Sequence, residues 1–234
     1  MINHLAVSEQ EIRNSKYIDE HFKNQIDLFN RSYDLFLESI SESENKLSSN
    51  INSDFHKVHL AMCMKINGDV RTILVALRCG WHGTAHTLFR DINDALVTIA
   101  LITKSPEYAI RIISGKFKND DIKKKAKEIG VIPPLDKKVY GRLSNIKHAE
   151  GEEILAWYGR NVGEKIQLRF FPELDAGHVE IILLFTCGLI IHAAIYYLEY
   201  HIGKYGPSFV LPSFEDSLKG IAAEINEPMT KSIE

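Results

Sequence analysis

Ionisable side chains recur every four residues in one apolar stretch of this 234-residue chain. The stretch reads RCGWHGTAHTLFRDIND, and the recurring residues are Arg78, His82, His86, Arg90 and Asp94. Four residues turn an α-helix through about 400°, so on one helix these five would form a ribbon that wraps slowly around it. Successive members can touch, and the last two have the spacing of a charge-assisted ion pair.

The two histidines of this ribbon raise the question of a metal site. His82 and His86 have the i, i+4 spacing with which two histidines on one helix can chelate a metal ion. The residues between them are Gly-Thr-Ala, so the carboxylate of a metalloprotease motif is missing, and no third ligand is evident. Structural histidines are the preferred interpretation, participation in an organic or RNA-phosphate site is the alternative, and no metal or other cofactor is predicted.

The charged end of the ribbon has two interpretations. Because a buried, unpaired Arg is costly, Arg90 and Asp94 are either an internal ion pair that fixes the register of the helix or the floor of a polar pocket inside a bundle. In both cases another helix, such as the one that carries His148, must meet them.

A second group of polar side chains lies in the segment VYGRLSNIKHAE. Tyr140, Ser144 and His148 repeat every four residues and so share one face of a predicted helix. Arg142 and His148 are six residues apart, about 120° around that helix, with Asn145 between them. The group offers a hydroxyl, an amide, a cation and a side chain that titrates near neutral pH.

An all-helical domain with an Arg, four to six residues and then a His on one helix resembles the HEPN (higher eukaryotes and prokaryotes nucleotide-binding) superfamily. Many members are metal-independent endoribonucleases of toxin–antitoxin, abortive-infection and CRISPR systems, whose Arg and His lie at a dimer cleft. The resemblance implies that His148 is the general acid/base, that Arg142 stabilises the phosphorane, and that Ser144 and Asn145 orient them. Leu143 departs from the family pattern, which usually has a polar residue directly after the Arg.

A looser pattern is similar to bacterial helical proteins that carry L-x-R-x-x-x-[ED] on an early helix and Y-x-x-x-S-x-x-x-H on a later one. This chain has LFRDIND over 88–94 and YGRLSNIKH over 140–148. The similarity covers about residues 60–200 and supports the helical fold without implying a particular chemistry.

Charge is distributed unevenly along the chain. The net charge is −3 overall and −5 over residues 1–54, but residues 116–147 hold ten Lys or Arg against four acids, a net charge of +6. Such a window is either a solvated surface or a patch that faces an anion such as nucleic acid. For an RNA substrate the side chains expected to contact the backbone or stack on a base are Lys123, Lys124, Lys138, Lys147 and Tyr140.

Hydrophobic periodicity predicts an all-α bundle of about six to eight helices. One bundle domain is expected over residues 1–212, followed by a short C-terminal helix and tail over 213–234. Residues 153–171 are predicted to form either a small β-hairpin or an irregular crossing loop. The predicted helices are 8–45, 53–66 (ended by a turn or kink at Asn67-Gly68), 70–103 (interrupted by glycines), 105–115, 120–130, 136–148, 174–202 and 213–226.

Residues 181–198 are apolar enough to be weighed as a membrane span. His192 within the segment, Glu180 and Glu199 at its ends and the lack of a flanking Lys/Arg cluster favour a central core helix instead. A protein that does not contact a membrane is therefore expected.

Small residues and cysteines add three smaller predictions. Small residues on the two most apolar helices predict that these helices approach closely and cross near their middles: Gly80, Gly83, Cys187, Gly188, Ala193 and Ala194. His56 and His59 are expected to be partly exposed. The three cysteines are far apart and odd in number, which indicates buried free thiols in a reducing cytoplasm.

Two functions follow from these patterns. The first is a HEPN-like protein that acts on RNA, as a homodimeric, metal-independent endoribonuclease in a bacterial defence or toxin-type system. The alternative is a non-catalytic module that binds a partner protein or a small ligand, in which Arg90, Asp94 and His148 form a structural cluster.

Overall fold

A computed structural model describes residues 4–47, 53–147, 159–162, 165–168, 174–206 and 212–231. Over these residues the chain forms nine helices and one antiparallel hairpin, so the predicted all-α bundle is confirmed. The hairpin, β1 (Gly159–Val162) and β2 (Lys165–Leu168), lies inside the predicted 153–171 segment. The helices are α1 (His4–His21), α2 (Lys23–Leu47), α3 (Asp54–Cys79), α4 (His82–Lys104), α5 (Tyr108–Ile113), α6 (Asn119–Glu128), α7 (Lys137–Lys147), α9 (Ala176–Tyr205) and α10 (Pro212–Lys231).

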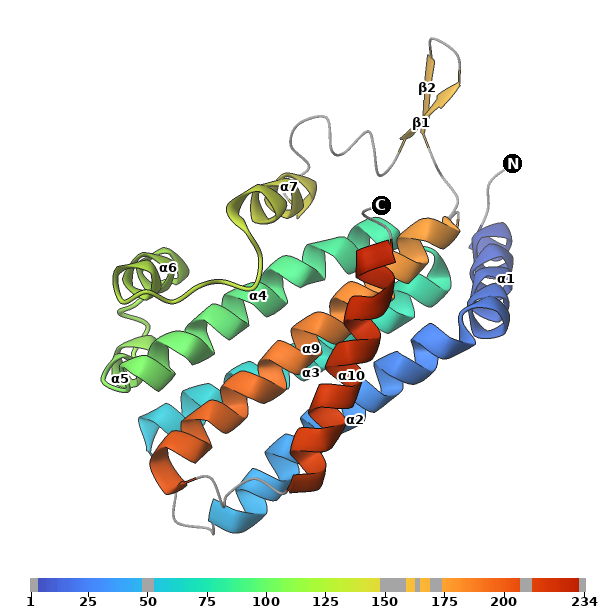
Figure 1. Ribbon diagram of the computed structural model, residues 1–234. Coiled ribbons are helices and arrows are strands. Elements are labelled where there is room, and N and C mark those ends of the chain that lie inside the picture. Colours follow the sequence, from blue (N-terminus) through green and yellow to red (C-terminus); the bar gives the residue numbers. More distant parts are fainter. Residues whose placement is uncertain are drawn as a thin grey trace.

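The apolar helix α9 lies at the centre of the bundle, and α2, α3, α4 and α10 pack against it (Figure 1). Its segment Ala176–Gly203 is the one stretch of the described chain long and apolar enough to cross a membrane, and 67% of its most apolar window is buried inside the protein. An added Cβ at Gly188 would meet no atom within 4 Å, so among the small residues of α9 this glycine does not itself mark a close approach.

The predicted single helix over 8–45 is two helices that meet at Phe22. Backbone hydrogen bonds continue through the junction, from Phe22 N to Ile18 O and from Ile26 N to Phe22 O, both 2.9 Å. The junction is therefore a bend, and it lets α1 pack against α3 while α2 packs against α9. The apolar stripe that predicted the helix is nonetheless buried, with Ile18, Phe29 and Phe36 at 0% exposure.

The ribbon of ionisable residues is divided between two helices. Gly80 has a positive φ of 85°, and a C-terminal turn closes α3 through bonds of 2.8 Å from Gly80 N to Leu77 O and from Trp81 N to Ala76 O. A new helix begins at His82. The prediction that Arg78 shares one helix with the other four members is therefore wrong.

Two other predictions on α3 are also wrong. The helix does not end at Asn67-Gly68 but continues through it, because Ile66 and Val70 on either side are fully buried and their packing outweighs the roughly 1 kcal/mol helix penalty of a glycine. His59 is 1% exposed rather than partly exposed. Two of the three free cysteines, Cys63 and Cys187, are buried as predicted, whereas Cys79 is half-buried.

His59 belongs to a buried group of aromatic and imidazole rings between α3 and α9. Its ring stacks on Tyr197 with centroids 4.7 Å apart, and Phe55 stacks on Tyr200 at 3.9 Å. His201 completes the group at 4.7 Å from Tyr197. We call these five residues the ring cluster.

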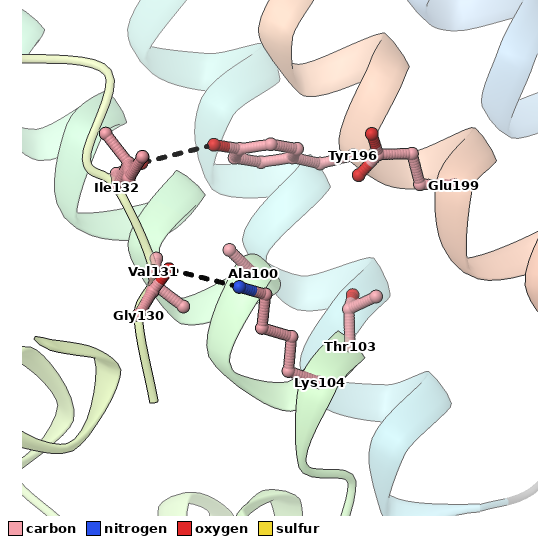
Figure 2. Close-up of a pocket in the computed structure, with 8 residues that line it drawn as sticks. All are labelled: Ala100, Thr103, Lys104, Gly130, Val131, Ile132, Tyr196 and Glu199. Carbon is pink, nitrogen blue, oxygen red and sulfur yellow. Dashed lines mark hydrogen bonds between the residues drawn. The ribbon is translucent and has the colours of Figure 1, made fainter. Parts of the chain in front are cut away.

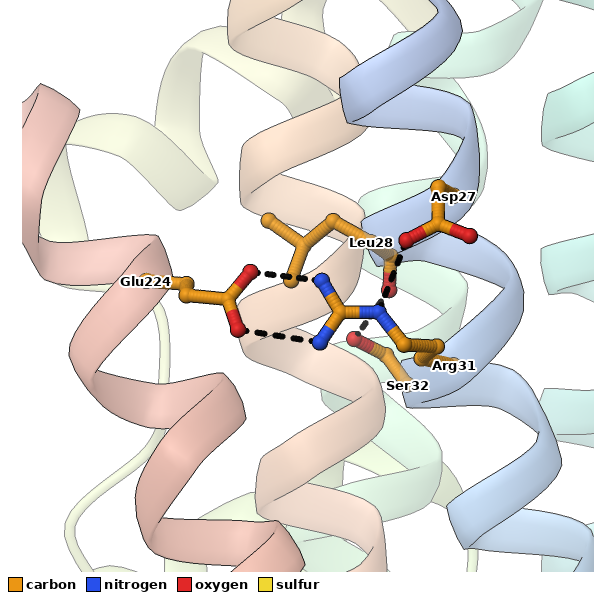
Figure 3. Close-up of polar contacts among 5 residues, drawn as sticks. All are labelled: Asp27, Leu28, Arg31, Ser32 and Glu224. Carbon is orange, nitrogen blue, oxygen red and sulfur yellow. Dashed lines mark hydrogen bonds and ion pairs between the residues drawn. The ribbon is translucent and has the colours of Figure 1, made fainter.

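The C-terminal helix α10 is longer than predicted and belongs to the main core, where Phe214, Ile221 and Ile225 are buried. On its outer side Glu224 receives a two-pronged bond from Arg31 of α2, with N–O distances of 2.9 and 2.5 Å (Figure 3). The Arg31 Nε atom also donates to Asp27, at 2.9 Å. These contacts tie α10 to α2 at the surface.

Candidate functional site

Polar side chains from α4, α6 and α7 converge at one place. Tyr140 Oη accepts hydrogen bonds from Arg90 Nε, at 2.8 Å, and from Lys123 Nζ, and it donates to Asp94 Oδ2 at 3.2 Å. Asp94 Oδ2 also accepts from Asn119 at 2.9 Å and pairs with Lys123 at 3.1 Å. We call these five residues the charged cluster. It brings together four predicted site residues from three different helices.

In the charged cluster, Arg90 and Lys123 keep their positive charge because they bond to acceptors, not because water surrounds them. Burial alone would lower the pKa of Arg90 and of Lys123, but the hydrogen bonds to Tyr140 and the charge of Asp94 outweigh it and raise the pKa of both. Both cations also lie over the Tyr140 ring, with Arg90 Cζ at 5.4 Å and Lys123 Nζ at 4.6 Å from its centroid. Both therefore remain charged at neutral pH.

The chain fixes the helices around this cluster with side-chain bonds to the backbone. Asn93 of α4 is 2% exposed, and its Oδ1 atom accepts from the backbone N–H of Leu135, at 3.0 Å, in the segment that links α6 to α7. Asp136 then caps α7, with Oδ1 accepting from the backbone of Lys138 at 2.7 Å and of Val139 at 2.9 Å. Both α6 and α7 pack against α4 (Figure 1).

The predicted catalytic side chains lie on and beyond α7. Arg142 is exposed, and Ser144 and Asn145 are half-buried. His148 follows α7 directly and lies outside the described residues. Leu143, the departure from the HEPN pattern, is 5% exposed and belongs to the main core, which explains why an apolar residue stands there.

The predicted substrate-binding residues divide into two groups. Lys123 and Tyr140 are engaged inside the charged cluster. Lys124 and Lys138 are exposed on α6 and α7, and Lys147 ends α7. We define the basic surface as the exposed side chains of Lys116, Lys118, Lys124, Lys127, Lys137, Lys138 and Arg142.

Most of the acids among these cations are used locally. Asp121 accepts from the backbone N–H of Lys118 at 3.1 Å, and Asp136 caps α7. Glu128 pairs with Lys125 at 2.9 Å. These carboxylates keep their negative charge, but residues 116–147 still carry a net charge of +6, so the basic surface has a positive field.

His82 and His86 lie at the start of α4, where His178 at the start of α9 faces both of them, with ring centroids 6.1 and 6.3 Å away. Asp175 donates its backbone N–H to His82 Nε2 at 3.3 Å. Burial, helped by the positive charges that His178 and His82 can carry, lowers the pKa of His86 to about 3. Among the described residues no group of three or more His, Cys, Asp or Glu side chains is placed to hold a metal ion.

Arg78 lies apart from the other members of the ribbon, on α3. Its Nη2 atom pairs with Asp19 of α1 at 2.8 Å, with both side chains partly exposed. Its observed partner is thus a surface carboxylate that ties α1 to α3.

No protein-family model, curated protein or solved structure matches this chain. The function must therefore be argued from its own residues.

Two contributors to these sites were missed from the sequence. Asn119 and His178 lie outside the ribbon, and the spacing of the ribbon residues does not point to either of them. Asp175 caps α9, because its Oδ1 atom accepts from the His178 backbone N–H at 3.1 Å. Recognising Asp175 as a cap in the sequence would have placed His178 in the first turn of that helix. Asn119 is 25 residues from Asp94 and has no such local signal.

Proposed function

We propose that this protein binds RNA through the basic surface of α6 and α7. The observation that carries the proposal is the exposure of seven cations on this surface, in a segment, 116–147, where ten Lys or Arg stand against four acids. Cations in such an arrangement bind a phosphate backbone by releasing its counterions.

The charged cluster has a supporting role in this proposal. It joins α4, α6 and α7 through Tyr140, Lys123 and Asp94, so the basic surface is held on the bundle as one unit. A fixed set of cations loses less conformational freedom on binding than lysines on independent segments would.

We further propose that the bound RNA is cleaved in the manner that the HEPN resemblance implies. His148 would remove the proton of a ribose 2′-OH, whose oxygen then attacks the adjacent phosphorus. Arg142 would stabilise the phosphorane charge, and the bond to the 5′-oxygen would break as that oxygen takes up a proton, leaving a 2′,3′-cyclic phosphate. Two protomers would supply two such pairs at a dimer cleft. The biological setting proposed from the same resemblance is bacterial defence.

RNA binding is tested by fluorescence anisotropy with a labelled single-stranded RNA over a range of salt concentrations. The triple variant Lys124→Gln, Lys127→Gln, Lys138→Gln should bind at least about ten-fold more weakly. Its plot of log affinity against log salt should be flatter by about 2, since each lost contact removes roughly 0.7. The matched control carries three exposed lysines of the other end of the chain: Lys16→Gln, Lys23→Gln, Lys57→Gln. Equal effects of the two triple variants would contradict the proposal.

Cleavage is tested separately with purified protein, RNA and EDTA. Arg142→Ala and His148→Ala should each abolish the appearance of 2′,3′-cyclic phosphate ends while leaving the thermal unfolding midpoint unchanged. If the wild-type protein binds RNA without cutting it, or if either variant cuts at the wild-type rate, the ribonuclease proposal fails and RNA binding stands alone.

The second candidate is a non-catalytic module that binds a partner protein or a small ligand. The observation in its favour is that Arg90, Lys123, Asp94 and Tyr140 bond to one another through the Tyr140 hydroxyl and Asp94 Oδ2, as side chains in a structural strut do. Failure of the anisotropy test would favour this alternative.

A further inference from the structure

A pocket of about 240 Å³ lies between the C-terminal part of α4, the C-terminal half of α9 and the segment that follows α6 (Figure 2). Two bonds hold that segment as the outer wall: Lys104 Nζ donates to Gly130 O at 3.1 Å, and Tyr196 Oη points to Ile132 O at 3.4 Å. Pockets for drug-sized ligands usually hold about 300–1,000 Å³, so this one limits its occupant to a smaller molecule.

A buried hydroxyl in this pocket has no hydrogen-bond partner among the described residues. Thr103 is one of the lining residues, but its Oγ1 atom itself is inaccessible to solvent. Three other helical threonines, Thr72, Thr98 and Thr186, each donate to the backbone carbonyl four residues earlier, at 2.6–2.8 Å. Thr103 does not use this local option, and an unsatisfied buried hydroxyl is costly unless a ligand group meets it.

Two opposite charges border the same pocket. Glu199 extends from α9 on the side where Thr103 lies, and the Lys104 ammonium lies on the opposite side, against the Gly130 wall (Figure 2). Burial raises the pKa of the Tyr196 phenol, and the negative charge of Glu199 raises it further. Lys104 has further N–H donors beyond the one that it gives to Gly130 O.

The remaining walls are apolar. They consist of the Ala100 methyl group, the side chains of Val131 and Ile132 and the Tyr196 ring. A molecule that fits all of these features carries a positive group, a negative group and a small apolar part.

We propose that this pocket binds a small zwitterion of the free amino-acid type. Its ammonium group would bond to Glu199 and, once a rotation of the Thr103 side chain exposes the hydroxyl, to Thr103 Oγ1. Its carboxylate would bond to Lys104, and its apolar side chain would contact Ala100 and Tyr196. The proposal is independent of RNA binding, because no member of the basic surface lines the pocket.

The test is isothermal titration calorimetry of the full chain with the standard L-amino acids at millimolar concentrations. The best ligand is then compared with its amide, which keeps only the positive charge, and with its N-acetyl derivative, which keeps only the negative charge. We expect the free amino acid to bind at least about ten-fold more tightly than either blocked form, the size of one lost charge-assisted hydrogen bond.

Two variants and one control assign the binding to this pocket. Glu199→Gln should weaken binding of the amino acid at least about ten-fold, and Thr103→Val should weaken it less, because Thr103 offers the ammonium group only an uncharged acceptor. Glu38→Gln changes an exposed carboxylate on α2 and should leave the affinity unchanged. Absence of binding by every amino acid, equal binding of a blocked form, or wild-type affinity in Glu199→Gln overturns the proposal. RNA anisotropy on the same samples keeps this result separate from the proposed RNA function.

Discussion

The charged cluster and the ring cluster keep polar groups inside the same bundle by opposite means. In the charged cluster Arg90 and Lys123 remain cations, because Asp94 and Tyr140 provide acceptors for them. In the ring cluster His59 is 1% exposed, and burial, then the positive charges of the neighbouring histidines, lower its pKa to about 3. One cluster pairs its charge, and the other excludes charge.

The difference follows from what surrounds each group. Asp94 is 14% exposed and Lys123 28% exposed, so water still screens part of their field. His59 lies between Tyr197 and Phe55, whose ring faces offer no carboxylate. A neutral imidazole is the form that such a site accommodates at the lowest cost. The two clusters should therefore respond to different perturbations.

The largest expected effect is on the ring cluster at acidic pH. The ordinary pKa of a histidine, 6.5, applies once the chain unfolds, whereas His59 in the folded protein titrates only at about 3. The unfolded chain therefore takes up the proton first, and the free energy of unfolding falls as the pH decreases from 6.5 to about 3. The loss is about 1.4 kcal/mol per pH unit for one such histidine.

Urea unfolding at several pH values between 7 and 4 measures this loss. The variant His59→Leu should lose less stability over the range than the wild type, although it starts from a lower value at pH 7. His86, whose pKa is also lowered to about 3, should leave part of the acid sensitivity in place. The control His192→Gln alters an exposed histidine and should follow the wild-type curve. A wild-type slope in His59→Leu would show that the ring cluster tolerates charge.

A smaller effect is expected when the charged cluster loses its anion. Asp94→Ala removes the acceptor of Lys123, Asn119 and Tyr140 and leaves two partly buried cations facing each other. We expect a loss of about 2–3 kcal/mol at pH 7, below the roughly 3–5 kcal/mol typical of fully buried pairs because of the partial exposure.

Chemical denaturation at pH 7 measures that change. Asp94→Asn, which keeps an acceptor of the same shape, should lose less than Asp94→Ala. The control Asp34→Ala, an exposed carboxylate on α2, should change stability by no more than about 0.5 kcal/mol. If Asp94→Ala lost no more stability than this control, Asp94 would not stabilise the two cations, and the contrast between the charged cluster and the ring cluster would not hold.

The sequence predicted the charged cluster better than the ring cluster. The four-residue spacing placed Arg90 and Asp94 together, and the expectation that a later helix must meet them agrees with the position of Tyr140. Spacing could not predict Lys123 as the third partner, because periodicity reports which face of a helix is polar and not which other helix adjoins it.

Local signals for the ring cluster were present, and we interpreted them wrongly. His59 is four residues after Phe55 and four before Cys63, both of which are buried, so it lies on the core face of α3. The turn at Gly80 was visible only as an interruption, because nothing local decides whether a glycine ends a helix or merely weakens it. Which helices pack together was settled by tertiary contacts that no single segment encodes.

The smallest effect is expected at the surface, where charge is paired without burial. The Arg31–Glu224 pair has the geometry of a strong two-pronged bond, but the two side chains are 43% and 49% exposed. Water screens their attraction, and ordering two long side chains costs entropy, so Glu224→Gln should lose no more than about 1 kcal/mol, and less in high salt. The same denaturation measurement with and without added salt checks this value. A loss as large as that of Asp94→Ala would mean that geometry, rather than burial, sets the strength of ion pairs in this bundle.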